Sequence, residues 1–229
     1  MWGTVVNSLA IVIGSLFGIG LNKGIKDDYK DTIMNAIGLT VIIIGIMGGI
    51  SSENIILVIA SLVIGSIIGE VIGIEKRLDK LGDSLQDKFG AKDSNFSKGF
   101  VTTSLVFCVG AIAIVGSLEG GIQGDHSTLF AKSIIDGITS VIFASTLGIG
   151  VAFSAIPVFL YQGSITIFSS LIKDLFTPEV INEMSAIGGI LIMAIGINIL
   201  DIKKIKVGNM LPAVIIPILY YIGKTLIAL

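Results

Sequence analysis

The chain has 229 residues, of which 53% are hydrophobic and 14% charged, and its mean hydropathy is +0.96. A soluble domain needs roughly a quarter of its residues charged to keep its surface hydrated, so this composition excludes an ordinary soluble protein. The net charge of −2 provides no basic surface for nucleic acid. The sequence therefore predicts a single all-α, polytopic membrane domain over residues 1–229, with the lipid bilayer as its main partner.

Eight segments are long and apolar enough to cross about 30 Å of hydrocarbon, which takes about 20 helical residues. The expected spans are residues 3–21, 32–50, 55–74, 100–118, 131–148, 154–172, 186–200 and 210–226. Between the fifth and sixth, only Gly148, Gly150 and Pro157 interrupt the apolar pattern, so one long span is the alternative to two. Because the first basic residue is Lys23, the first span lacks the basic start of a cleaved signal peptide and is expected to remain as an anchor.

The distribution of basic residues decides between these counts. With eight spans and both termini outside, the loops at 22–31, 75–99 and 201–209 face the cytoplasm. These loops carry twelve of the fifteen basic residues, namely Lys23, Lys26, Lys30, Lys76, Arg77, Lys80, Lys88, Lys92, Lys98, Lys203, Lys204 and Lys206. Cytoplasmic loops are enriched in Lys and Arg, so the asymmetry favours eight spans.

Two extramembrane segments have recognisable patterns. Within 75–99, Leu78, Leu81, Leu85 and Phe89 recur at helical spacing among charges, which predicts a cytoplasmic amphipathic helix on the membrane surface or the bundle. A gate or partner-binding element is the alternative. Before the seventh span, the order Thr-Pro-Glu at 177–179 predicts a capped helix start outside the lipid.

Glycines recur at four-residue spacing in several spans. The pairs are Gly14 and Gly18, Gly45 and Gly49, Gly65 and Gly69, and Gly116, Gly120 and Gly124. Such stripes let helix backbones approach closely in lipid, so they predict a tight bundle or a homo-oligomer. The runs at 13–18 and 64–69 are similar, as are those at 36–38 and 186–188. The second pair relates helices of opposite direction, as an inverted repeat of spans one to three with six to eight would require, and chance similarity is the alternative.

Polar residues are concentrated in the fifth and sixth spans. Ten Ser or Thr residues lie there, at 133, 139, 140, 145, 146, 154, 164, 166, 169 and 170, with Asp136 and Gln162 among them. Polar groups in lipid are costly and tend to mark transport pathways. The alternative is that the hydroxyls bond back to their own helix carbonyls.

The strongest candidates for a pathway lie in this cluster. Lys132 and Asp136 are four residues apart and share a helix face, which Thr139 and Ser140 are expected to continue. A purely structural ion pair with a snorkelling Lys132 is the alternative. Gln162, near mid-span, can bind a solute or join helices.

Two further acids, Glu119 and Glu70, are weaker candidates. Glu119 belongs to the external loop 119–127, which is either a cation-attracting mouth or a solvated loop. Glu70 has no cation in its own span, so we expect it to face the bundle interior or its cytoplasmic mouth. Asn7, Asn35 and Asn198 lie near span ends, where interfacial hydrogen bonding is expected.

No motif suggests an enzyme, a metal site or a cofactor. The sequence has no Gly-x-Ser-x-Gly elbow, no His-Glu-x-x-His and no phosphate-binding loop. Its only histidine, beside two acids in the loop 119–127, has no recognisable metal-ligand spacing. Cys108 is the only cysteine and is expected to be a small core residue.

The runs at 107–117 (FCVGAIAIVGS), 132–137 (KSIIDG) and 161–163 (YQG) resemble the YdfK/YqgA-like family of bacterial membrane proteins. The likeness extends over nearly the whole chain. It implies a multi-pass protein of the bacterial inner membrane and supplies no substrate.

Two functions follow from these patterns. The first is a transporter or channel for a small ion or solute, with its pathway between the fifth and sixth spans. The second is a non-transporting scaffold or sensor that acts through residues 75–99. Hydrated polar residues in the two spans would favour transport, and polar residues paired in a dry bundle would favour the scaffold.

Overall fold

A computed structural model gives the structure of residues 1–22, 27–89 and 95–227, so the expected cytoplasmic residues Lys23, Lys26 and Lys92 lie outside the described part. Within that part every regular element is helical. The elements are α1 (Trp2–Asn22), α2 (Asp27–Gly49), α3 (Ile55–Ile72), α4 (Ile74–Phe89), α5 (Phe96–Cys108), α6 (Ala111–Ile122), α7 (Ser127–Leu147), α8 (Gly150–Phe153), α9 (Ala155–Ile172), η1 (Lys173–Leu175), α10 (Pro178–Ile199), α11 (Val207–Met210), η2 (Leu211–Ile215) and α12 (Ile216–Ile227). Among these residues, seven helices are long and apolar enough to cross a membrane, or eight if the bent pair α5–α6 is one span. The predicted all-α membrane bundle is confirmed.

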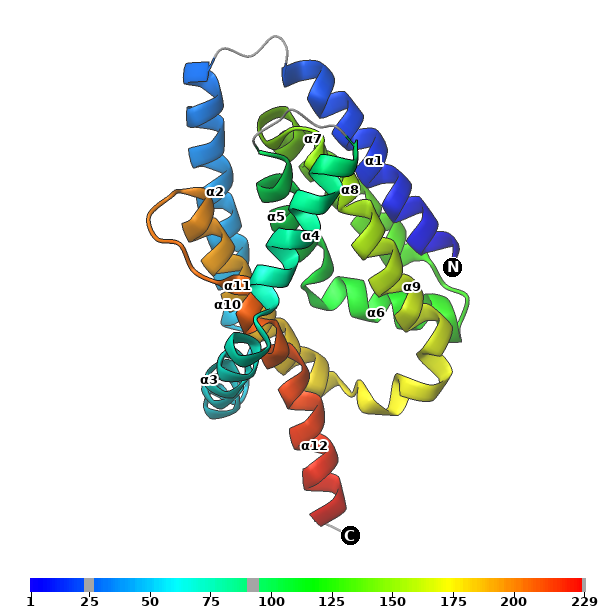
Figure 1. Cartoon of the computed structure of the whole chain (residues 1–229). Helices are drawn as coiled ribbons and strands as arrows, with labels where there is room; N and C mark the ends of the chain where they lie inside the picture. The colour runs from blue at the N-terminus through cyan, green and yellow to red at the C-terminus, as the bar shows by residue number, and fades with distance from the viewer. Residues whose placement is uncertain (23–26, 90–94, 228–229) are drawn as a thin grey trace.

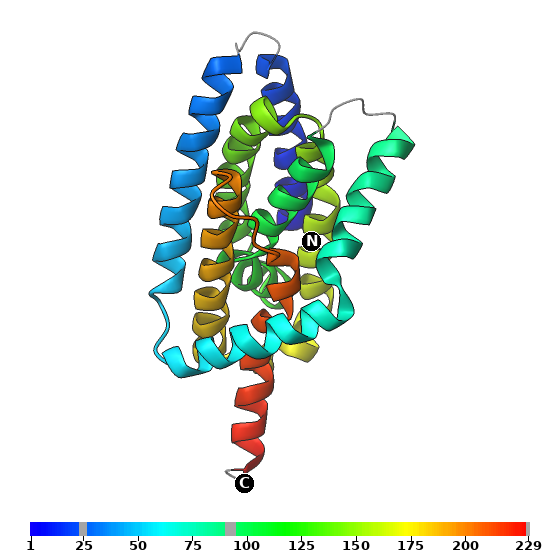
Figure 2. The same cartoon turned by 60° about the vertical axis from the view of Figure 1, so that its left-hand side comes forward.

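Helices from the two ends of the chain pack side by side. α1 lies along α7, α2 lies along α10, and α3 contacts α11 and η2 (Figures 1 and 2). Figure 2 shows α3 running across one end of the bundle, and in both views α12 projects beyond that end. The long apolar runs of the sequence thus form a core in which α10 is the most buried of the candidate spans.

The glycine stripes make these close approaches possible. A Cβ on Gly14 would meet the carbonyl oxygen of Gly137, and one on Gly69 would meet the carbonyl oxygen of Asn209. On α2, a Cβ at Gly45 would meet the α10 backbone. These faces are therefore occupied within one chain. A homo-oligomer remains a prediction, and it would need other surfaces than these.

The expected fourth span, residues 100–118, is not one helix. α5 ends at Cys108, α6 begins at Ala111, and the two are bent by 62°. At the break Val109 is extended, with φ −82° and ψ 127°, and Gly110 has φ 137° and ψ 147°. Only glycine adopts this last conformation readily, so Gly110 is what allows the helix to break here.

We expect Gly110→Asn to destabilise the protein by about 1–3 kcal/mol, the cost of a residue held in so unfavourable a backbone conformation. Gly124→Asn is the matched control: neither glycine has an atom within 4 Å of an added Cβ, but the φ of Gly124 is 71°, which asparagine tolerates. Unfolding of the purified protein in detergent would measure both. Equal effects of the two substitutions would show that the break does not depend on the Gly110 backbone.

Described residues from the three loops expected in the cytoplasm line one cavity. Lys98 pairs with Asp201 at 3.5 Å, and this pair lines a cavity of about 560 Å³ together with Asp31 and Asn35. Asp31, Lys98 and Asp201, one residue from each of the three expected loops, therefore lie on the same side of the protein. Which side of the membrane this is, and the outward orientation of the termini, remain predictions.

The expected amphipathic helix forms as α4 and ends at Phe89, while Phe96 already begins α5. The segment 75–99 is thus partly α4 and partly the start of a span. α4 packs on α5 and α11, with Leu78 against the core and Leu81 exposed. The predicted start of α10 is confirmed, because Pro178 is its first residue and the Thr177 side chain accepts a hydrogen bond from Val180 N.

Hydrogen bonds join the first turn of α4 to α11. The Glu75 carboxylate accepts from Gly208 N at 2.6 Å, and Glu75 N donates to Asn209 Oδ1 at 2.7 Å. Burial raises the pKa of Glu75, and the bond from Gly208 opposes this rise. Between the ordinary and the raised pKa the folded chain binds more protons than the unfolded chain, so stability falls as pH rises through that interval.

We therefore expect Glu75→Gln, which keeps an acceptor for Gly208 and removes the charge, to stabilise the protein at neutral pH and to flatten this pH dependence. Thermal unfolding in detergent at a series of pH values measures it. Asp87→Asn removes a charge from an exposed position of the same helix and is the control. If Glu75→Gln leaves the pH dependence of stability unchanged, the raised pKa of Glu75 is not its cause.

Candidate functional site

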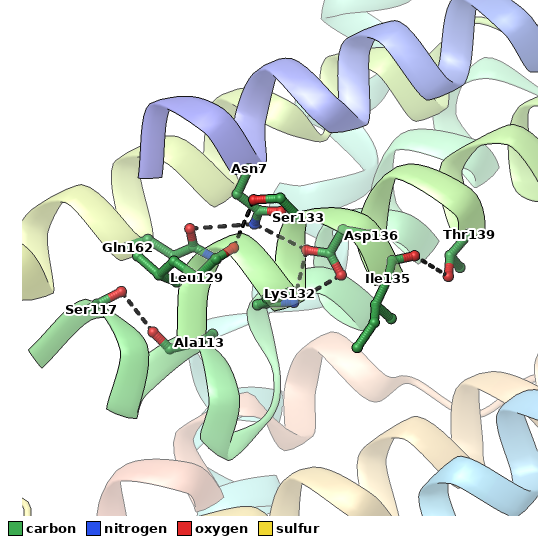
Figure 3. Close-up of polar contacts among 10 residues, drawn as sticks. All are labelled: Asn7, Ala113, Ser117, Leu129, Lys132, Ser133, Ile135, Asp136, Thr139 and Gln162. Carbon is green, nitrogen blue, oxygen red and sulfur yellow. Dashed lines mark hydrogen bonds and ion pairs between the residues drawn. The ribbon is translucent and has the colours of Figure 1, made fainter. Parts of the chain in front are cut away.

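The candidate site is a buried polar cluster formed by four side chains from α1, α7 and α9 (Figure 3). Lys132 Nζ donates to both carboxylate oxygens of Asp136, at 2.9 and 2.8 Å. Asn7 Nδ2 donates to Asp136 Oδ2 at 3.0 Å and to Gln162 Oε1 at 3.3 Å. The exposed fraction is 7% for Lys132, 3% for Asp136, and 0% for Asn7 and Gln162. We call these four residues the buried polar cluster.

The helix pattern explains why these side chains meet. On α7, residues 132, 136 and 140 are one turn apart and all buried, so they form one face. On α1, residues 4, 7, 11 and 15 form a matching buried stripe. Because Gly14 has no side chain, α1 approaches α7 so closely that a Cβ at this position would lie 3.2 Å from Ser140 Cβ. This close approach brings Asn7 within hydrogen-bonding distance of Asp136.

Several polar atoms around the cluster have no hydrogen-bonding partner among the residues that the structure describes. They are Thr4 Oγ1, Asn7 Oδ1, Ser8 Oγ, Ser140 Oγ and Gln162 Nε2. An unpaired buried polar group costs about 1–3 kcal/mol, so proteins place such groups where water or a ligand can bind them. The cluster therefore offers donors and acceptors beyond those that its own members satisfy.

The two halves of the broken span pack on the helices that carry the cluster. α5 contacts α7, which carries Lys132 and Asp136, and α9, which carries Gln162. α6 in turn contacts α1, α7 and α9. Both halves of the broken span therefore belong to the packing around the buried polar cluster.

Four of the predicted site residues lie in the buried polar cluster or beside it, but their contacts differ from those expected. Lys132 is buried in the ion pair and does not snorkel, and Asp136 and Gln162 are joined through Asn7. Ser140 lies on the same buried face. The cluster is therefore not formed by the fifth and sixth spans alone, because α1 supplies the residue that bridges them.

The other three predicted site residues lie outside the cluster. Thr139 is only half-buried and donates to its own helix at Ile135 O, 2.7 Å away (Figure 3). Glu119 accepts from Thr128 at the α6–α7 turn, at 2.6 Å. Glu70 faces neither the interior nor an empty mouth: its half-exposed carboxylate pairs with Lys206 at 2.7 Å and accepts from Asn209 at 2.6 Å.

Two residues were missed by sequence reasoning. Asn7 was expected at the membrane interface but is fully buried in the cluster, and the polar stripe at 4, 7, 8 and 15 was the available signal. Glu183 on α10 is 1% exposed and accepts from Ser52 Oγ at 2.6 Å and from the amides of Glu53 and Asn54 at 3.0 Å. Because its oxygens are bonded to the α2–α3 turn, we read Glu183 as a structural anchor of that turn.

Comparison with known proteins places the chain in a family. Residues 2–222 match the model of a protein family described as "Protein of unknown function (DUF554)". The chain belongs to this DUF554 family. It is 40% identical over 221 residues to "Uncharacterized membrane protein YdfK" of Bacillus subtilis (strain 168), covering 95% of this chain and 94% of that protein. It is 31% identical over 219 residues to "Uncharacterized protein YqgA" of Escherichia coli (strain K12), covering 93% of each.

The resemblance to the YdfK/YqgA-like family is therefore confirmed along nearly the entire chain. The name of the first relative agrees with the apolar helices in making this DUF554 protein a membrane protein. No solved structure matches the chain significantly.

Proposed function

We propose that this DUF554 protein is a transporter or channel for a small polar solute or ion, and that its pathway follows the buried face of α7 through the buried polar cluster. The observation that carries this proposal is a Lys–Asp pair inside an apolar bundle, surrounded by polar atoms without partners. Ionisable residues within membrane bundles are costly and mark substrate or ion pathways. A broken helix beside such residues is a recurring feature of transporter binding sites.

The shape of one end of the bundle supports a route to the cluster. The cavity at the Lys98–Asp201 pair is also lined by Thr146 and Leu147, at the end of α7. From Leu147 the buried face of α7 continues through Phe143 and Ser140 to Asp136, a distance of about 16 Å along the helix. This face forms the inner half of the proposed pathway.

A barrier of aromatic side chains lies on this route. Phe143 packs edge to face on Phe107 of α5, with ring centroids 6.4 Å apart, and both rings are buried. Phe143 lies between Leu147 and Asp136 on α7, so passage along the proposed route requires this ring pair to move. A pathway with a dry barrier beside a bound-solute position fits a carrier that opens to one side at a time.

Flux into proteoliposomes tests the proposal. We expect the purified protein to carry a selective flux when H⁺, Na⁺, K⁺ and Cl⁻ gradients and labelled polar solutes are screened. Asp136→Asn and Gln162→Ala should each reduce that flux at least about tenfold, because the first removes the charged partner of Lys132 and the second leaves the buried Asn7 amide without one of its acceptors. Thr139→Val is the matched control, because Thr139 is on α7 next to the cluster but bonds only within its own helix.

Flux that is unaffected by Asp136→Asn and Gln162→Ala would place the pathway elsewhere. A folded protein without flux of any tested solute would favour the scaffold or sensor function. That alternative has limited surface to act through, because α4 packs on α5 and α11 and uses Glu75 and Leu78 in contacts within the chain.

A further inference from the structure

The chemistry of the buried polar cluster restricts the class of solute that it can bind. Lys132 and Asp136 are each other's charged partner, and the cluster has no net formal charge. A single cation at Asp136 would displace Lys132, and a single anion at Lys132 would displace Asp136. Either exchange leaves one buried charge unpaired, which costs several kcal/mol. The cluster therefore disfavours a lone monovalent ion.

A zwitterion avoids this cost. Its carboxylate can replace Asp136 as the partner of Lys132, and its ammonium can replace Lys132 as the partner of Asp136. The Lys132–Asp136 ion pair is then replaced by two charge-assisted contacts with the ligand, and no charge is left unpaired. The long, flexible side chain of Lys132 can make this rearrangement with the α7 backbone fixed.

The surrounding groups match the remaining hydrogen-bonding needs of such a ligand. Gln162 Nε2 is a free donor and Asn7 Oδ1 is a free acceptor among the described residues, and the Ser140 hydroxyl can serve as either.

We propose that the buried polar cluster binds a small zwitterion of the amino-acid class, with Lys132 at the carboxylate and Asp136 at the ammonium. This inference rests on the proposed transport function and names its substrate class. The ligand must be small, because it has to fit among side chains of α1, α7 and α9 that are at most 7% exposed.

Binding to the purified protein in detergent tests the proposal with matched probes. Glycine, alanine and serine carry both charges, whereas acetate and methylammonium each carry one of the two. We expect the unaltered protein to bind at least one of the three amino acids and to bind neither single-charge probe measurably. Thr139→Val should bind as the unaltered protein does.

Variants of the pair give a second, sign-dependent readout. Asp136→Asn and Lys132→Gln should each weaken amino-acid binding by about 10- to 150-fold, as expected for the loss of a hydrogen bond to a charged group. Asp136→Asn should gain affinity for acetate, because Lys132 is then unpaired, and Lys132→Gln should gain affinity for methylammonium. The double variant is neutral and should bind none of the probes; size-exclusion chromatography and helical circular dichroism check that it folds.

Binding of acetate or methylammonium by the unaltered protein as tightly as of an amino acid would overturn the proposal. So would amino-acid binding that the double variant retains, or no amino-acid binding at all. Selective ion flux without amino-acid binding would overturn this inference and leave the transport proposal standing. Amino-acid binding at the pair without any flux would overturn the transport proposal and leave the binding of a zwitterion standing.

Discussion

Replacing Asp136 with alanine is expected to destabilise the protein by about 3–5 kcal/mol, the cost of leaving one member of a buried ion pair without its partner. Both oxygens of Asp136 accept from Lys132, and one also accepts from Asn7. The substitution leaves the 7% exposed Lys132 with its charge uncompensated inside an apolar bundle. Unfolding in mixed detergent with a rising fraction of SDS would measure the loss.

The matched control removes both charges. Lys132→Met combined with Asp136→Leu keeps a similar volume and leaves no unpaired charge, so its stability should be within about 1–2 kcal/mol of the unaltered protein. Flux should nevertheless be lost. If the double variant is stable and still transports, the ion pair is a structural element only. If Asp136→Ala costs less than about 1 kcal/mol, the pair is not buried as described.

The second large effect is expected at the contact of α1 with α7. Gly14→Ala should destabilise the protein by about 1–3 kcal/mol or more, the range for overpacking a close contact. The added Cβ would meet the carbonyl oxygen of Gly137 and would lie 3.2 Å from Ser140 Cβ. The helices must then separate, which moves Asn7 away from Asp136, so flux should fall together with stability.

Gly20→Ala is the control on the same helix. No atom lies within 4 Å of a Cβ at Gly20, so the change should stabilise α1 by about 0.5–1 kcal/mol through helix propensity. The unfolding and flux assays above measure both substitutions. Equal tolerance of alanine at the two positions would mean that α1 and α7 are not in close contact.

The transmembrane helices could be predicted because hydropathy is a local property. A run of about 20 apolar residues must become a helix in lipid, whatever surrounds it. The same reasoning failed at residues 100–118, where one backbone conformation, that of Gly110, divides the span in two. Gly110 lies in a run of small and apolar residues, where hydropathy does not distinguish a break from a continuous helix.

The sequence could predict the part of the candidate site that lies on α7, and not the contacts that α7 makes with other helices. Lys132, Asp136 and Ser140 follow from the spacing of one helix, so sequence alone placed them on one face. Thr139 lies only about 20° from Lys132 around the helix, but it is half-buried and donates to Ile135 O of its own helix, so spacing alone did not show that it stays outside the cluster. Glu70 has no cation in its own span, as expected, and its partner Lys206 is 136 residues away in the chain, where helical spacing gives no signal.

By itself the sequence determined that this DUF554 protein is a helical membrane bundle, and that charged and polar groups lie within it. The tertiary structure decided which of those groups meet. Asn7 joins Asp136 over 129 residues of sequence and Gln162 over 155, through an approach of α1 to its neighbours that glycines permit. Hydropathy and helical spacing act over one or two turns, whereas such contacts depend on how whole helices pack, which no local pattern specifies.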